Sequence, residues 1–251
     1  MDHRPNRPHA FASTRWSLVA GGAEGGEQGR RALGELCEIY WFPLYAYVRR
    51  QGVAAGDAED LVQGFLGLLI ERNDLATLDA SRGRFRAFLI AALRNFVNNE
   101  RDRERATKRG GDRELISMDA DDGERRYLAE CSAADTPERA YERGFALELI
   151  ARCMHELGDD WRRAGREDDY AKLSTLLTPG GDATYREVGE SLAMSESAVK
   201  MAVHRLRRRM SELLRAEIRD VVLEDEDVEV EIQHLFVVLG SSGQGFSART
   251  E

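Results

Sequence analysis

Apolar residues recur at helical spacing along most of the chain. Between residues 31 and 50 they lie three or four positions apart, which predicts a helix that is interrupted near Pro43. Residues 57–60, which include three acidic side chains, then open a strongly apolar helix over 61–70. Acidic residues favour a first helical turn because they complement the helix dipole. The chain therefore begins its ordered part with two helices.

A long third helix is predicted after a loop at residues 79–83. Its apolar face is formed by Phe85, Phe88, Leu89, Ala92 and Phe96. Arginines become frequent toward its C-terminal end. Residues 110–135 are acidic and show no periodicity, so we interpret this stretch as a linker.

Helical order resumes at Thr136, which is suited to cap a helix that starts at Pro137. A further helix is predicted around residues 170–177. Thr184 and Glu187 then match a capping box, which predicts a helix from Tyr185 to about residue 192. No strand-like alternation of convincing length occurs, so the predicted fold class is all-α.

The next helix, with Ser195 as its N-cap, carries the sharpest local pattern. One stripe is apolar and comprises Val199, Val203, Leu206, Met210 and Leu213. The opposite face carries mostly polar and basic side chains and one apolar one: Ser197, Met201, His204 and Arg208, flanked by Lys200 and Arg205. Two helices joined by a short connector, the second with an exposed basic face, favour a DNA-reading helix-turn-helix. An ordinary helical hairpin with a basic face is the alternative.

Charge is segregated along the chain. The 251 residues include 36 Lys and Arg against 45 Asp and Glu, a net charge of −9. Residues 82–109 nevertheless carry a local net of +6 and residues 199–219 a net of +5, whereas 112–139 carry −5 and 220–232 contain seven acidic and no basic residues. These two basic blocks, each on an amphipathic helix, favour a polyanionic partner that contacts the chain at both blocks.

Other features exclude several classes of protein. No apolar run approaches the roughly 18 residues of a membrane span. The first five residues, Met-Asp-His-Arg-Pro, begin no apolar segment of a secretory signal, so we expect a cytoplasmic protein. Three cysteines without Cys-x-x-Cys spacing are expected to be reduced thiols. The isolated histidines indicate no metal site, and no cofactor is expected.

At this point the sequence resembles the sigma-70 family of RNA polymerase initiation factors, of the small extracytoplasmic-function type. The resemblance rests on Tyr40–Tyr47 and the Asp-Ala-Glu-Asp-Leu-x-Gln motif at 57–63, on 81–95, and on 185–210 with its Ala-Val-Lys at 198–200. Thr14–Ser17 and Lys108–Gly111 are similar to a subgroup from planctomycete-like bacteria that carries a C-terminal extension. The resemblance covers roughly residues 30–110 and 138–219 and leaves no room for sigma region 3.

The resemblance implies two helical domains joined by an acidic linker. With the flanking extensions, the chain is then divided into five segments: a flexible N-terminal extension (1–30), a region 2-like domain (31–110), the linker (111–135), a region 4-like helix-turn-helix domain (136–219) and an acidic C-terminal extension (220–251). The implied partners are core RNA polymerase and promoter DNA, with no membrane and no catalytic residue in this chain.

The resemblance also implies roles for individual residues. The polymerase would be bound by Asp57, Glu59, Asp60, Leu61 and Gln63. The minus-ten element would be contacted by Arg84, Arg86, Arg94, Asn95, Arg101 and Arg105. The minus-thirty-five duplex would be contacted by Ser197, Lys200, Met201 and His204 at base edges and by Arg205 and Arg208 at phosphates.

Two other functions compete with this interpretation. A stand-alone helix-turn-helix regulator would bind palindromic DNA as a dimer and would leave the 57–63 helix unexplained. A metal-dependent nuclease would use Asp57, Glu59 and Asp60 as a carboxylate cluster, but no histidine or second carboxylate motif supports it. The C-terminal extension is expected either to fold against the basic face of the second domain or to recruit a partner, such as an anti-sigma factor or another regulatory protein.

Overall fold

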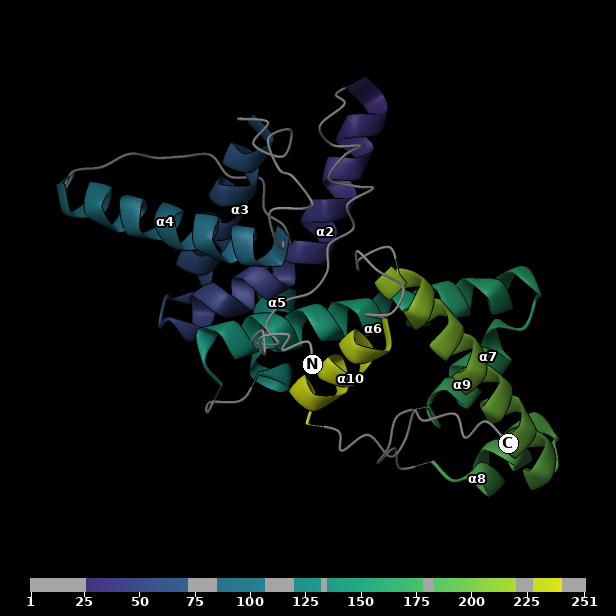
Figure 1. Ribbon diagram of the computed structural model, residues 1–251. Helices are drawn as coiled ribbons and strands as arrows, with labels where there is room; N and C mark the ends of the chain where they lie inside the picture. The colour runs from purple at the N-terminus through teal and green to yellow at the C-terminus, as the bar shows by residue number, and fades with distance from the viewer. Residues whose placement is uncertain are drawn as a thin grey trace, which may run out of the picture. The chain divides into compact units, whose positions relative to one another are not determined.

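The computed structural model describes residues 26–71, 85–106, 120–131, 135–177, 183–219 and 228–240, and every regular element within these ranges is an α-helix (Figure 1). The all-α prediction is confirmed for this part of the chain. The chain divides into two compact units. The first comprises residues 1–145 and 218–231, and the second comprises residues 146–217 and 232–251. The predictions for Thr14–Ser17 and Lys108–Gly111 lie outside the described residues.

The first unit is built on helix α2 (Gly26–Arg50), which packs against α3 (Ala55–Glu71). The predicted interruption at Pro43 is wrong, because α2 continues through the proline. Phe42, Pro43 and Leu44 are all buried. A Cβ on Gly144 would lie 3.1 Å from the Pro43 Cα, so a glycine is what allows this close approach. Packing around Pro43 thus compensates for the hydrogen bond that a proline removes.

Helix α4 (Phe85–Ala106) packs against α3, where Phe96 of the predicted face lies 5.9 Å from Phe65 between ring centroids. Its deepest positions are Leu89, Leu93 and Val97, whereas Phe88 and Phe96 are half-buried. The buried stripe is therefore turned by about one residue relative to the prediction. The aromatic rings of Phe88 and Phe96 lie at the edge of this stripe, where large rings can cover the core while they stay partly exposed.

The predicted linker contains a helix, α5 (Ala120–Glu130), which packs on α2 and α3. The interpretation of this stretch as a linker is wrong for residues 120–130, which form a helix. Glu124 accepts hydrogen bonds from Arg49 Nε (2.7 Å) and Nη2 (2.6 Å) and from the Tyr45 hydroxyl (2.6 Å). A Cβ on Gly123 would come within 2.6 Å of the Trp41 ring, so the helix sits directly on an aromatic surface. Specific tertiary contacts hold α5 despite its weak apolar periodicity.

We expect Glu124→Ala to destabilise the first unit by about 2 kcal/mol, since it removes hydrogen bonds to a charged group that is less than a third exposed. The Arg49 hydrogen bonds, with that from Tyr45, hold the pKa of the Glu124 carboxyl below its usual value. Its contribution is therefore complete above about pH 4.3, the pKa of an unfolded glutamate, and is lost as the pH falls through the lower folded pKa. Urea unfolding at several pH values measures this.

Glu124→Gln is the matched variant, because it keeps the size of the side chain and removes its titration. In the wild-type chain, titration of Glu124 makes the free energy of unfolding lower at acidic than at neutral pH. In Glu124→Gln this difference should be much smaller. A wild-type pH dependence that Glu124→Gln leaves unchanged would contradict the assigned ion pair.

The remaining helices are α6 (Pro137–Arg163), α7 (Glu167–Ser174), α8 (Tyr185–Leu192), α9 (Glu196–Arg219) and α10 (Val228–Val238). The predicted start of α6 is confirmed, and the Thr136 hydroxyl accepts a hydrogen bond from the Arg139 N–H at 3.2 Å. Helix α7 begins three residues earlier than predicted, and residues 175–177 form turns instead of its last part. Residues 228–238 show that the C-terminal extension contains a helix of its own.

Candidate nucleic-acid interface

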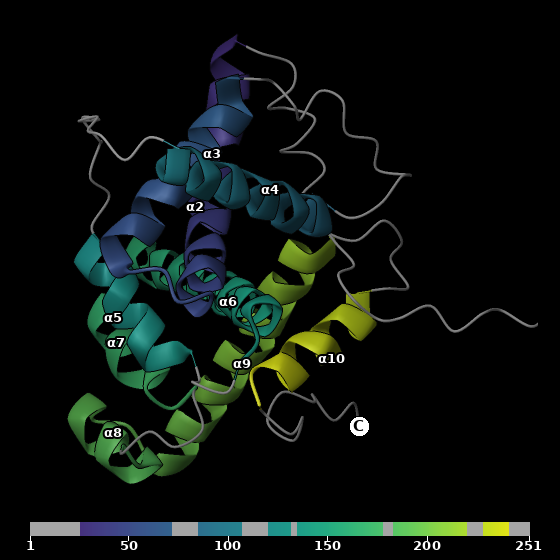
Figure 2. The same ribbon diagram turned by 90° about the vertical axis from the view of Figure 1, so that its left-hand side faces the viewer.

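The second unit contains two helices, α8 and α9, joined by a short turn, and they lie side by side at their junction (Figures 1 and 2). The predicted capping box starts α8: the Glu187 N–H donates to the Thr184 hydroxyl at 3.2 Å, and the Thr184 N–H donates to the Glu187 carboxylate at 2.8 Å. The predicted cap of α9 is also present, since the Ala198 N–H donates to the Ser195 hydroxyl at 3.2 Å. Both helix starts are therefore encoded locally.

The turn between these helices depends on two backbone features. Ala193 ends α8 in the left-handed conformation, with φ of 52°. Gly189 lies under the turn, and a Cβ there would come within 2.7 Å of the Met194 carbonyl oxygen and 3.5 Å of Val199. The absence of a side chain at Gly189 thus lets α8 approach the chain that leads into α9.

Helix α9 buries one stripe and exposes the other, as predicted. Val199, Val203, Leu206, Met210 and Leu213 are each 5% exposed or less. The residues predicted to contact DNA are all exposed, namely Ser197, Lys200, Met201, His204, Arg205 and Arg208. Met201 is 58% exposed, an apolar side chain among polar and cationic ones. The structure therefore presents the six predicted residues on one accessible helix.

Two of these cations have acidic neighbours one helical turn away. The Lys200 ammonium lies 2.6 Å from Glu196 and 5.7 Å from the centre of the Tyr185 ring. The pKa of Lys200 is raised by the hydrogen bond to Glu196. Arg208 lies 3.5 Å from Glu212. Glu196 is not among the residues predicted from the sequence, although its spacing of four residues from Lys200 indicates a pair on one helix face.

Other basic residues of this block hold the unit together. Arg207 donates to the Leu176 carbonyl oxygen at 2.9 Å, and Arg209 lies 3.3 Å from Asp160 of α6. Lys172 of α7 similarly donates to the Ser191 carbonyl oxygen at 3.0 Å. The local charge of +5 therefore overstates what α9 offers to a ligand.

In the first unit, the acidic motif at the start of α3 is split between surface and interior. Asp57 and Asp60 are exposed. Glu59 is 7% exposed and accepts a hydrogen bond from Gln63 at 3.0 Å. Leu61 and Gln63 are half-buried. Asp57 and Asp60 are thus the accessible carboxylates of this motif, while Glu59 and Gln63 contact each other.

Helix α4 positions the residues predicted to contact the minus-ten element. Arg94 and Asn95 are exposed, and Arg101 is half-buried. Arg84 lies outside the described residues, as does the side chain of Arg105. Arg94 and Arg101 lie about two helical turns apart on the same side of α4, an arrangement that suits contacts along a phosphate backbone.

Arg86 differs from the other predicted DNA contacts because it is 1% exposed. Its Nη2 lies 2.6 Å from Glu231 of α10, and its guanidinium carbon lies 4.4 Å from the centre of the Phe145 ring. In this structure Arg86 cannot reach a phosphate. Its position follows from helical spacing, since Arg86 lies on the same stripe as Leu89, Leu93 and Val97.

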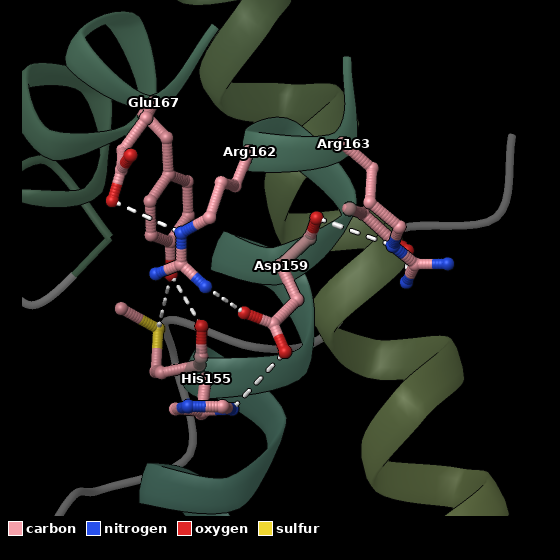
Figure 3. A network of polar contacts seen from close by, with 8 residues as sticks. His155, Asp159, Arg162, Arg163 and Glu167 are labelled. Atoms are coloured by element: carbon pink, nitrogen blue, oxygen red, sulfur yellow. Dashed lines mark hydrogen bonds and ion pairs between the residues drawn. The ribbon is translucent and has the colours of Figure 1, made fainter. Parts of the chain in front are cut away.

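A polar network joins the end of α6 to α7 (Figure 3). Arg162 donates to Asp159 and, at 3.1 Å, to Glu167, while Arg163 donates to Asp160 at 2.7 Å. His155 lies 3.5 Å from Asp159. These carboxylates are paired with arginines on an exposed surface, where ion pairs contribute little to stability. No group of three or more His, Cys, Asp or Glu in the described ranges is placed to hold a metal ion.

Searches against protein-family models, curated proteins and solved structures found no match to this chain. Among the described helices, none combines the length and the apolar character needed to cross a membrane.

Proposed function

We propose that this protein is a sigma-type initiation factor that binds core RNA polymerase and directs it to promoters. The observation that carries the proposal is the α8–α9 pair, a capped helix-turn-helix whose second helix exposes polar and cationic side chains. A helix of this kind fits the major groove, where its side chains read base edges. In the proposal α9 contacts the minus-thirty-five duplex.

In the proposal the first unit binds the polymerase and the minus-ten element. Asp57 and Asp60 face solvent on α3, as expected for carboxylates that bind basic residues of the polymerase. Arg94, Asn95 and Arg101 on α4 would hold the single-stranded minus-ten element through phosphate contacts and base contacts. In the proposal the polymerase forms the phosphodiester bonds of the RNA, and this chain only binds and positions the polymerase and the DNA.

The charge distribution supports a factor that acts through the polymerase. Several cations of α9 are balanced by Glu196, Glu212 and Asp160. The net charge of −9 opposes binding to DNA over long distances. Such a protein is suited to engage promoters when polymerase positions both units on the same DNA.

A test must separate this function from a stand-alone helix-turn-helix regulator. Sedimentation of the free protein, followed by selection from a randomised duplex library with and without core polymerase, makes that separation. We expect a monomer that enriches a two-part motif when polymerase is present. A dimer that enriches a palindrome without polymerase would favour the regulator instead.

Met201 provides a residue-level prediction for the duplex. Its exposed apolar side chain suits the 5-methyl group of a thymine. Replacing the contacted thymine by deoxyuridine should weaken wild-type binding about fourfold, because a buried methyl group contributes about 0.8 kcal/mol. Fluorescence anisotropy with duplexes substituted at one thymine at a time measures this.

Met201→Ala is the control, because it should bind the thymine and deoxyuridine duplexes equally. Wild-type binding that is insensitive to deoxyuridine at every position of the selected motif would remove Met201 from the set of base-reading residues.

A further inference from the structure

A buried ion pair joins α4 to the C-terminal helix within the first unit. The Arg86 Nη2 donates to the Glu231 Oε1 at 2.6 Å, and the two side chains are 1% and 5% exposed. The partners are 145 positions apart in the sequence. Two charges are removed from water together here, which is stable only when each has a close counter-charge. Glu231 therefore occupies a specific site on this unit.

Aromatic rings enclose this site. The Arg86 guanidinium lies over Phe145, and the Phe145 ring is stacked on Tyr40 with a centroid distance of 5.7 Å. Tyr141, one turn before Phe145 on α6, is also fully buried. A guanidinium on aromatic faces retains its positive charge and the geometry to bind an anion. The walls thus come from α2 and α6, and the anion comes from α10.

The occupant belongs to the most acidic stretch of the chain. Residues 220–232 contain seven acidic side chains and no basic one. Residues 220–227 lie outside the described residues, so Glu231 is where the structure shows this stretch making a buried contact with the first unit. This contact with the first unit differs from both alternatives expected from the sequence, a contact with the basic face of the second domain and the recruitment of a partner.

We propose that Glu231, at the start of α10, docks in cis on the first unit and thereby withdraws Arg86 from the proposed DNA-binding surface of α4. The inference rests on the proposed function, because it assigns a regulatory segment to the same DNA-binding surface. Carboxylate and phosphate are both anions that a guanidinium binds through paired hydrogen bonds. Arg86 cannot serve both at once, so Glu231 and a DNA phosphate compete for it.

The competition follows from simple linkage. DNA that contacts Arg86 through a phosphate binds more tightly to the undocked state of the protein. The apparent affinity for DNA therefore falls as the docked fraction of the protein rises. Removing the charge of Glu231 leaves Arg86 buried without this counter-charge, which favours its exposure to water. The undocked protein then gains one phosphate contact on the surface that already includes Arg94 and Arg101.

The test measures binding of a fluorescein-labelled oligo(dT) to the full chain over a range of salt concentrations. Glu231→Gln should bind severalfold more tightly than wild type. The slope of log K against log salt concentration should steepen by about 0.7, the value for one more phosphate contact on a single strand. Equal affinity and equal slope for the two proteins, including no binding by either, would overturn the proposal.

A double variant, Arg86→Met with Glu231→Met, separates charge from folding. Apolar residues of similar volume preserve a buried site while removing both charges. This protein should show wild-type helicity by circular dichroism and none of the gain in oligo(dT) binding. A gain as large as that of Glu231→Gln would show that loosening of α10, and not release of Arg86, is responsible, and would overturn the proposal.

Hydrogen exchange gives an independent measurement on the wild-type chain. Amides of residues 228–238 should lose protection when oligo(dT) binds, because DNA displaces Glu231 from Arg86. Unchanged protection at saturation would contradict the competition. Transcription with core polymerase reports separately on the proposed function. A wild-type chain that supports transcription while Glu231→Gln binds oligo(dT) like wild type refutes the docking proposal alone.

Discussion

Gly189→Ala is expected to disrupt the helix-turn-helix and to weaken binding to a promoter duplex by tenfold or more. The new Cβ would lie 2.7 Å from the Met194 carbonyl oxygen, which is backbone and cannot rotate away. We expect a loss of about 2–3 kcal/mol in the unfolding free energy of the second unit, typical of overpacking against a fixed group. A tenfold loss of affinity corresponds to about 1.4 kcal/mol of binding free energy. Thermal unfolding and fluorescence anisotropy measure the two quantities.

Gly67→Ala is the matched control, because it makes the same chemical change in the interior of α3. Gly67 is exposed, and nothing lies within 4 Å of where its Cβ would be. Alanine should there stabilise the helix by about 0.5–1 kcal/mol, since glycine loses more conformational entropy on folding. If Gly189→Ala is as stable as Gly67→Ala and binds duplex DNA normally, then Gly189 does not lie as close to the Met194 carbonyl oxygen as stated here.

Asp60→Ala is expected to weaken binding to core polymerase by tenfold or more, which corresponds to at least about 1.4 kcal/mol. Asp60 is exposed near the start of α3, so its removal leaves the core of the first unit intact. Its carboxylate would face basic residues of the polymerase, and truncating one partner of such a pair leaves the other charge uncompensated. Surface plasmon resonance with immobilised core polymerase measures the loss.

Glu71→Ala tests whether the effect is specific to the start of α3. Glu71 is an exposed carboxylate at the other end of the same helix, so it changes the net charge equally. It should bind polymerase like wild type, and both variants should retain duplex binding through α9. Equal polymerase binding by Asp60→Ala and wild type would contradict the assigned interface.

The starts of α8 and α9 could be predicted from the sequence because their determinants are local. Thr184 and Glu187 are three positions apart and form the two hydrogen bonds of a capping box. Ser195 caps the helix that follows it. The apolar stripe of α9 follows a spacing that any amphipathic helix obeys. The exposed face opposite that stripe, including Met201 and His204, followed without knowledge of the tertiary fold.

The placements of Arg86 and α5 depended on contacts between distant segments. Arg86 lies on a buried stripe, but a prediction that assigns every arginine to the surface misses it unless the counter-charge Glu231 is known. Helix α5 has few apolar residues and is held by Glu124 and Gly123 against α2. Both cases involve a partner more than 70 positions away, which neither helical spacing nor local charge indicates.

Glu59 illustrates the same limit within a single motif. The sequence pattern groups Asp57, Glu59 and Asp60 as one acidic surface. The structure turns Glu59 inward, where Gln63 donates to it. Helical geometry separates adjacent residues by 100°, so a motif defined by sequence order does not share one face. Asp57 and Asp60 are therefore the better targets for mutation.

Transcription in a reconstituted system tests the central claim most directly. Core RNA polymerase is incubated with a template library that is randomised upstream of a reporter transcript, with and without this protein, and the RNA products are sequenced. We predict specific initiation that requires the added protein and enriches two separated sequence elements, and that is lost with Asp60→Ala. Transcription that is identical with and without the protein, while the protein binds core polymerase or duplex DNA normally, would contradict the account.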